Sequence, residues 1–248
     1  AAVLVFGMTS LMQRKKLGDL DTVVTGGTDR MGGGDGPVLV LLHGFGAPGE
    51  DLVSLHRVLR APAGTRFIFP AAPLSLGLMP STESRAWWMI DMLKMQQAME
   101  RGELRDLTAD VPDGLAEARA KVDAMLDDIT RTMTPSWIAL GGFSQGAMLS
   151  MDVALRSSRK LKGLVLMSGT LLAEREWLPL MSKRKGLPVY QSHGTHDPIL
   201  PFSIAERLRD EMKKAELAVT FTQFRGAHEI PGAVIDGVGK FLESLAGP

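Results

Sequence analysis

Cysteine is absent from all 248 residues of the chain. Without cysteine the chain forms no disulfide, has no cysteine nucleophile and binds no metal through thiolates. Covalent catalysis in this protein would therefore need another nucleophile, and serine is the residue we look for first.

An excess of charge of one sign is also lacking. The 28 lysines and arginines balance the 28 aspartates and glutamates, so the formal net charge is zero. A balanced chain has no net field that would attract nucleic acid or an anionic membrane. The apolar run at residues 1–8 is too short to span a bilayer. We therefore expect no nucleic-acid partner, no stable membrane insertion and a cytoplasmic location.

The hydrophobic pattern predicts an α/β fold. Apolar runs at residues 66–70, 137–143 and 163–167 have the length of strands, and a helical stretch at 114–132 lies between the first two. Such alternation favours a mostly parallel central sheet with helices on both faces. The length fits one domain, so we expect residues 1–248 to form a single unit.

The motif Gly142-x-Ser144-x-Gly146 is the most informative feature of the sequence. It directly follows an apolar strand-like run and directly precedes a helical stretch. This context is typical of a nucleophile elbow, whose glycines leave room for neighbouring backbone while the sharp turn exposes the serine hydroxyl. The turn also aims the N–H of Gln145 and the positive end of the helix at a developing oxyanion. Ser144 is therefore the candidate nucleophile.

The order of residues along the chain then selects a base and an acid. In hydrolases with this elbow, the acid follows the serine and the histidine follows the acid. His228 lies on a loop between a predicted strand and helix, and Asp197 follows a predicted strand at residues 187–191. Taken singly, His228 could be a solvated loop residue and Asp197 a helix cap. Their joint order favours convergence with Ser144 at the carboxyl ends of the strands, where open α/β sheets bind ligands.

An earlier loop supplies a candidate oxyanion donor. It follows a buried strand-like run at residues 37–42 and contains two glycines, Gly44 and Gly46. Glycines at these positions let the backbone turn tightly over the site. The N–H of Phe45 would then join the N–H of Gln145 in an oxyanion hole.

Three further histidines are not expected to be catalytic bases or metal ligands. His43 begins the candidate oxyanion loop, where we expect its ring to orient the backbone. His193 and His196 are expected to share one turn. Because no third ligand clusters with these two, we predict no metal site.

The segments 43–46, 141–147, 193–198 and 226–230 resemble the phospholipase/carboxylesterase family of α/β-hydrolases, which includes acyl-protein thioesterases. The likeness extends from about residue 37 to the C-terminus. It implies an α/β-hydrolase fold that needs no cofactor. It also implies a role for each candidate residue: Ser144 as nucleophile, His228 as base, Asp197 as orienting acid, and Phe45 and Gln145 as oxyanion donors.

Residues 74–112 form a longer stretch than a compact member of that family would have, so we predict a lid or cap insertion there. Within it, Trp87 and Trp88 resemble a tryptophan-bearing segment near the family's acyl pocket. Trp88, Met92 and two later methionines fall on one helical face. That face could pack on the body as an ordinary amphipathic helix, or it could line an acyl pocket. Trp87, Trp88 and Met92 are the candidate substrate-binding residues.

The sequence thus predicts a serine hydrolase that cleaves carboxylic esters through an acyl-serine intermediate, with thioesters or lysophospholipids as further substrates. Its expected partner is a small-molecule ester or acyl compound. Two alternatives stay open: a serine peptidase of the same fold, and a non-catalytic protein that binds an apolar ligand on a hydrolase scaffold. A homodimer is also left open.

Overall fold

The computed structural model describes residues 12–77, 83–91, 97, 100–101 and 106–247. Within these residues, the main sheet has nine strands, β1 (Gln13–Leu17), β2 (Leu20–Gly27), β3 (Met31–Gly33), β4 (Val38–Leu42), β5 (Arg66–Pro70), β8 (Ile138–Phe143), β9 (Gly163–Met167), β10 (Pro188–Gly194) and β11 (Ala218–Phe224). The helices are η1 (Val53–Arg57), α2 (Leu115–Met133), α3 (Gln145–Arg156), α4 (Glu174–Met181), η2 (Ser182–Arg184), α5 (Phe202–Lys214) and α6 (Gly232–Leu245).

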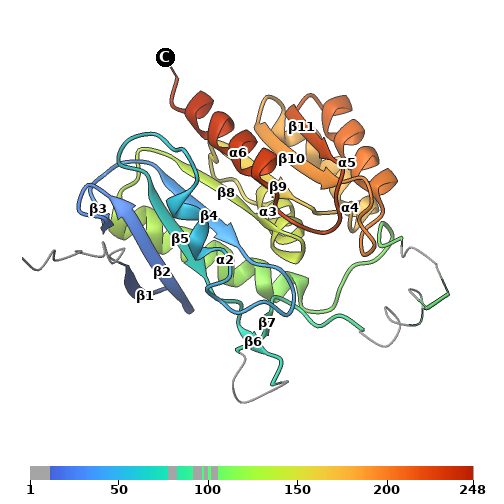
Figure 1. The fold of residues 1–248 in the computed structure, drawn as a ribbon, viewed down its shortest axis with the longest axis horizontal. Coiled ribbons are helices and arrows are strands. Elements are labelled where there is room, and N and C mark those ends of the chain that lie inside the picture. Colours follow the sequence, from blue (N-terminus) through green and yellow to red (C-terminus); the bar gives the residue numbers. More distant parts are fainter. Residues whose placement is uncertain (1–11, 78–82, 92–96, 98–99, 102–105, 248) are drawn as a thin grey trace, which may run out of the picture.

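The sheet is antiparallel at one edge and parallel through the rest (Figure 1). Its strand order is β1-β2-β5-β4-β8-β9-β10-β11, with β3 paired to β2. The β1–β2 and β2–β5 pairs are antiparallel. All pairs from β5 through β11 are parallel. The central strands are buried along nearly their whole length, as strands covered on both faces must be.

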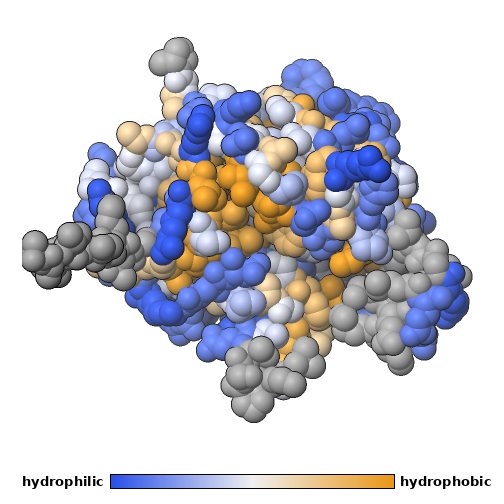
Figure 2. All heavy atoms as spheres, viewed as in Figure 1, coloured by the Kyte–Doolittle hydropathy of each residue, from blue (hydrophilic) through white to orange (hydrophobic). Residues whose placement is uncertain are grey.

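Helices cover both faces of this sheet, as predicted. Alternate residues of β4 show the division: Val38, Val40 and Leu42 belong to a buried cluster with α2, α3, α4 and α5. Leu39 and Leu41 belong to a second buried cluster with η1 and α6. Figure 1 shows α6 crossing the near face of the sheet with α2 and α3 behind it, and Figure 2 shows hydrophobic residues gathered beside α6.

The register of the parallel strands brings their carboxyl ends to one level. Leu42 at the end of β4 lies opposite Gly142 of β8, and Gly194 at the end of β10 lies opposite Phe224 of β11. The loops that follow these strands therefore begin side by side, although they are far apart in the sequence. This edge of the sheet is where an α/β protein builds its ligand site.

The predicted insertion is described only in part. Its first segment is a small antiparallel pair, β6 (Leu74–Ser75) with β7 (Arg85–Ala86). The helical face expected to start at Trp88 was wrong at that residue, because Trp88 lies in a bend and residues 89–91 form no helix. Met92 and the other methionines of the predicted stripe lie outside the described residues, so a lid at 74–112 stays a prediction. None of the described helices combines the length and apolarity that crossing a bilayer requires.

One expected boundary was wrong. The strand expected at residues 187–191 continues to Gly194 as β10, because its pairing with β11 runs through Ser192 and His193. His193 is therefore a buried strand residue and does not share a turn with His196.

Candidate active site

The backbone of Ser144 adopts the strained conformation of a nucleophile elbow. Ser144 has φ 54° and ψ −117°, between β8 and α3. Its N–H donates to the Met167 carbonyl at 2.9 Å, which anchors the turn to β9. A side chain at Gly142 or Gly146 would collide with the Leu42 carbonyl of β4. The glycines of the motif are therefore required by the close approach of β4, and the strain stays localised at the candidate nucleophile.

Helix α3 begins directly after Ser144. The Ser144 carbonyl accepts the N–H groups of Ala147 at 3.0 Å and Met148 at 3.1 Å. The N–H of Gln145 belongs to the first turn, where backbone donors have no partner within a helix and the dipole is positive. Gln145 and Phe45 line the same cavity as Ser144. Both predicted oxyanion donors thus border the candidate nucleophile.

The loop that presents Phe45 is held from behind by the β7 region. The Gly46 N–H donates to the Arg85 carbonyl at 2.8 Å, and the Arg85 N–H donates to the Ala47 carbonyl at 3.1 Å. The Trp87 indole N–H donates to the His43 carbonyl at 2.9 Å. These bonds fix the backbone before and after Phe45, so the oxyanion loop is ordered by the chain itself.

His43 orients the loop and is not placed to be a base. Its Nε2 accepts the Ala72 N–H at 3.0 Å, so Nδ1 carries the proton and donates to the Gly44 carbonyl at 2.8 Å. Burial lowers the pKa of His43 below its ordinary value of 6.5. Both ring nitrogens are therefore occupied by the backbone, as expected from the sequence.

The side chain of Gln145 has a second function that sequence reasoning missed. Its Oε1 accepts the Trp87 N–H at 2.9 Å, and its Nε2 donates to the Trp88 carbonyl at 2.9 Å. The amide thus pairs with the backbone of residues 87–88 as a strand would. Nothing in the motif besides the amide itself indicates this contact.

Asp197 and His228 form the predicted acid–base pair. His228 Nδ1 lies 2.6 Å from Asp197 Oδ2, and the carboxylate is fully buried. The other oxygen, Oδ1, accepts the N–H groups of Ile199 and Leu200, both at 2.9 Å. Burial alone would raise the pKa of Asp197. The hydrogen bonds from His228, Leu200 and Ile199 outweigh burial and hold this pKa below its ordinary value.

Backbone contacts between two loops bring this pair together. The Thr195 N–H donates to the Phe224 carbonyl at 2.9 Å, and the His196 N–H donates to the Gly226 carbonyl at 3.0 Å. A side chain at Gly194 would strike the carbonyls of residues 226 and 227. The turn that carries Asp197 is therefore packed directly on the loop that carries His228.

Ser144 and His228 line one apolar cavity of about 190 Å³. The ring of Phe143 lies 4.8 Å from the ring of His228, between centroids, and packs it toward the cavity. No hydrogen bond joins the Ser144 hydroxyl to His228 among the described residues. In hydrolases this contact is often long without substrate. Four of the five residues that the sequence assigned to acyl transfer line this cavity, and the fifth, Asp197, contacts His228.

A second cavity of about 480 Å³ adjoins the first. Ile90, Leu107 and Met148 line both cavities and form the partition between them. Trp88 lines this second cavity, which we call the outer cavity. Trp87 lines neither cavity, because its indole is buried on the His43 carbonyl. Trp87 thus supports the oxyanion loop and does not occupy the substrate-binding position that we expected for it.

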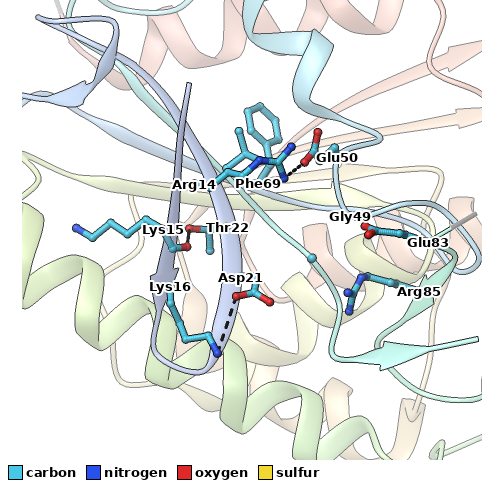
Figure 3. A pocket seen from close by; sticks show the side chains of 12 residues that line it. Arg14, Lys15, Lys16, Asp21, Thr22, Gly49, Glu50, Phe69, Glu83 and Arg85 are labelled. Atoms are coloured by element: carbon cyan, nitrogen blue, oxygen red, sulfur yellow. Dashed lines mark hydrogen bonds and ion pairs between the residues drawn. The ribbon is translucent and has the colours of Figure 1, made fainter. Parts of the chain in front are cut away.

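A third hollow of about 360 Å³ borders the later part of the oxyanion loop at Gly49 and Glu50, over β1, β2 and β5 (Figure 3). Its lining is charged, with Arg14 paired to Glu50 and Lys16 paired to Asp21 at 3.9 Å. Arg85 donates from Nη1 to the Ala72 carbonyl at 3.0 Å. Each of these three basic groups therefore has a partner within the chain.

The parallel sheet, the elbow at its centre and the aspartate–histidine pair at its carboxyl edge define the α/β-hydrolase class of serine hydrolases. Residues 33–246 match the model of the Phospholipase/Carboxylesterase family. The chain belongs to this family and is an acyl hydrolase that cleaves carboxylic esters.

Individual relatives agree with the family match. The chain is 31% identical over 170 residues to acyl-protein thioesterase 1 of Kluyveromyces lactis, covering 66% of this chain and 71% of that protein. Its fold is similar to the crystal structure of esterase PE8, with TM-score 0.74, 24% identity and coverage of 95% and 99% of the two chains. It is also similar to Zea mays acyl-protein thioesterase 2, with TM-score 0.66, 22% identity and coverage of 91% and 99%.

Proposed function

We propose that Ser144 is the nucleophile, His228 the general base, and Asp197 the acid that orients it. The observation that supports these roles most strongly is the 2.6 Å contact between His228 Nδ1 and the buried Asp197 carboxylate, at the wall of the cavity that contains Ser144. Asp197 holds the Nδ1–H tautomer, so that His228 Nε2 has a lone pair available to accept the Ser144 proton.

In the first half-reaction the Ser144 hydroxyl attacks the ester carbonyl while His228 takes its proton. The carbonyl oxygen becomes an oxyanion that accepts the N–H groups of Phe45 and Gln145. The tetrahedral intermediate collapses to an acyl-serine, and the leaving alcohol or thiol receives the proton from His228. In the second half-reaction water attacks the acyl-serine by the same path, which releases the acid and restores Ser144.

The cavities support an apolar acyl group as the substrate's reacting part. The catalytic cavity alone is smaller than the roughly 300–1,000 Å³ of typical ligand pockets, whereas the outer cavity lies within that range. A short acyl group fits beside Ser144. A long chain would have to pass between Ile90, Leu107 and Met148 into the outer cavity. We propose medium to long acyl esters and thioesters as substrates, in keeping with the names of the thioesterase relatives.

The geometry favours this function over the two alternatives. A protein that only binds an apolar ligand would gain nothing from a buried carboxylate aimed at a histidine, because burying such a group is costly without a role for it. A peptidase of the same fold would need room for a polypeptide on both sides of Ser144, and the described cavity is small. A cytoplasmic location and a homodimer remain predictions from the sequence.

Hydrolysis of p-nitrophenyl esters from acetyl to palmitoyl tests the proposal. The wild type should show an optimum beyond acetyl, and Ser144→Ala should lose at least about 10⁴-fold in kcat at every chain length. Ser150→Ala is the matched control, since this buried serine on the same helix donates to the Gly146 carbonyl at 2.8 Å and does not line the cavity. Activity that survives in Ser144→Ala would contradict the assignment.

The partition between the cavities can be tested in the same assay. Met148→Trp enlarges a side chain that lines both cavities and should block the path of long acyl chains. We expect the ratio of kcat/KM for palmitoyl over butyryl ester to fall roughly 10–100-fold, as for a misfitted apolar pocket. Met151→Trp on the same helix is buried outside both cavities and controls for overpacking of the core. An unchanged ratio in Met148→Trp would place the acyl chain elsewhere.

A further inference from the structure

A second histidine lies against the catalytic aspartate. His193 of β10 has a fully buried side chain, and its Nε2 lies 3.3 Å from Asp197 Oδ2. The same Nε2 lies 3.0 Å from the Leu200 carbonyl. Oδ2 of Asp197 therefore lies between two imidazoles, His228 on the cavity side and His193 on the interior side.

The neighbours of His193 fix its tautomer. A carbonyl can only accept, so the contact with Leu200 requires the proton on Nε2, and that N–H is shared between Leu200 and Asp197 Oδ2. The opposite nitrogen, Nδ1, is buried and has no partner within hydrogen-bond geometry among the described residues. A second proton on Nδ1 would be poorly satisfied, because the backbone of Gly169 interacts with the ring too weakly to offset burial. Burial accordingly lowers the pKa of His193 below its ordinary value, and the ring is neutral.

Leu200 closes a ring of contacts around the carboxylate. Its N–H donates to Asp197 Oδ1 at 2.9 Å, while its carbonyl accepts from His193. Oδ1 is thus fixed by backbone, and Oδ2 by the two imidazoles. Of these donors, only the two histidines can be removed by substitution without altering the backbone, and His228 is the proposed base itself.

We propose that His193 is a positioning residue for acyl transfer, whose Nε2–H holds Asp197 Oδ2 toward His228 and offsets part of its negative charge. The proposal rests on the roles proposed for Ser144, Asp197 and His228. Its chemical consequence concerns the base. Without this N–H the carboxylate would keep more of its negative charge and would attract a protonated His228 more strongly, so less of the free base would be present near neutral pH.

Other charged groups near the pair keep their own contacts. His196 lies on the same turn, with its Nδ1 3.0 Å from the Thr195 hydroxyl. Glu229 beside His228 accepts the Ala227 N–H at 3.1 Å. Asp51 lines the same cavity as His228. None of these contacts involves His193, so a change confined to that residue isolates its effect on Asp197 and His228.

The test compares two substitutions at position 193. His193→Leu removes the donor at similar volume, whereas His193→Gln keeps an amide N–H near the position of Nε2. The readouts are the pH profile of kcat/KM for a p-nitrophenyl ester and the pH profile of Ser144 labelling by a fluorophosphonate. For His193→Leu we expect the acid limb of both profiles to move up by about 0.5–1 pH unit. We expect kcat to fall roughly 10-fold with KM changed less than about twofold. His193→Gln should restore the wild-type limb.

Gln191→Leu is the matched structural control. Gln191 lies two residues earlier on the same face of β10, is buried, and donates to the Ala205 carbonyl at 2.8 Å without touching Asp197. It should lower the melting temperature as much as His193→Leu does, yet leave the acid limb in place. If the acid limb moves equally in Gln191→Leu and His193→Leu, the shift comes from a general change in the structure, and the proposal is overturned.

A folded His193→Leu enzyme with the wild-type acid limb would also overturn it. If that variant does not fold, His193→Asn takes its place, because its shorter amide cannot reach Asp197 Oδ2. The acid limb is then expected to move up in His193→Asn and to stay at its wild-type position in His193→Gln. Acid limbs at the same pH in these two variants would contradict the proposal. Failure of the triad assignment is a separate result, seen as labelling that persists in Ser144→Ala.

Discussion

Two hollows share the oxyanion loop as a wall, and they differ in how their polar groups are used. The catalytic cavity is lined by apolar residues apart from the proposed machinery and Asp51, and the Asp197 carboxylate behind it is fully buried. The hollow in Figure 3 is lined by charged residues that are paired with one another at the surface, such as Arg14, 78% exposed, with Glu50.

The difference shows which charges can affect chemistry. An exposed ion pair exchanges water for a partner and contributes about 0–1 kcal/mol. A buried carboxylate has no water to replace a lost donor, so each hydrogen bond to it affects its charge and its direction. We therefore expect large effects from small changes around Asp197, and small effects from large changes in the charged hollow.

Asp197→Asn should have the largest effect in this comparison. The amide keeps the size of the side chain but presents an N–H₂ or a weaker acceptor to His228, which favours the wrong tautomer of the base. We expect kcat to fall about 10³–10⁴-fold, with the melting temperature lowered only modestly. Steady-state kinetics and thermal unfolding of the same preparation measure both. A loss of stability with near-normal turnover would show that Asp197 is a helix cap.

Gln145→Ala should have the next largest effect. The backbone N–H of residue 145, the proposed oxyanion donor, is kept, but the Trp87 N–H and the Trp88 carbonyl lose their buried partner. Leaving such groups unpaired costs about 1–3 kcal/mol each. We expect a free energy of unfolding lower by at least about 2 kcal/mol in urea denaturation, and a loosened outer cavity. An unfolding midpoint equal to that of the wild type would remove the role assigned to this side chain.

The sequence was sufficient for the parts that depend on local geometry. The elbow glycines and the buried strand before each loop follow from steric and periodicity rules. The order of serine, aspartate and histidine was taken from hydrolases with this elbow, and the structure places Ser144 and His228 at one cavity. The pairing of β10 with β11 was not visible in the sequence, so the end of β10 and the burial of His193 were missed.

Trp87 shows why aromatic candidates are harder to assign. A tryptophan near a pocket can either line it or support it, and only the direction of the indole decides. Here the indole N–H donates inward to the His43 carbonyl. The partition at Ile90, Leu107 and Met148 was likewise invisible, because residues from three separate segments meet there.

Acidification should destabilise the wild type through its buried neutral histidines. Folding lowers the pKa of His193 below its ordinary value of 6.5. As the pH falls through 6.5, the unfolded chain therefore takes up a proton at this residue before the native state does. Stability from this group is present above pH 6.5 and is lost as the pH falls below it. The loss is at most about 1.4 kcal/mol per pH unit. His193→Gln should show a shallower fall between pH 6.5 and 5, measured by urea unfolding. Parallel curves would mean that folding does not change the pKa of His193.

Arg14→Ala in the charged hollow should have the smallest effect. Its ion pair with Glu50 is exposed, so we expect a change in unfolding free energy within about 0.5 kcal/mol and ester hydrolysis within about twofold. The double-mutant cycle with Glu50→Ala measures the pair directly. A tenfold change in activity would show that this side of the oxyanion loop is coupled to catalysis.

The most direct test of the account is to locate the covalent adduct. The wild type would be labelled with a fluorophosphonate, digested and mapped by mass spectrometry. We predict one adduct per chain, on the peptide that contains Ser144, and complete loss of ester hydrolysis once that adduct has formed. An adduct on another residue, or full esterase activity in the enzyme labelled at Ser144, would contradict it.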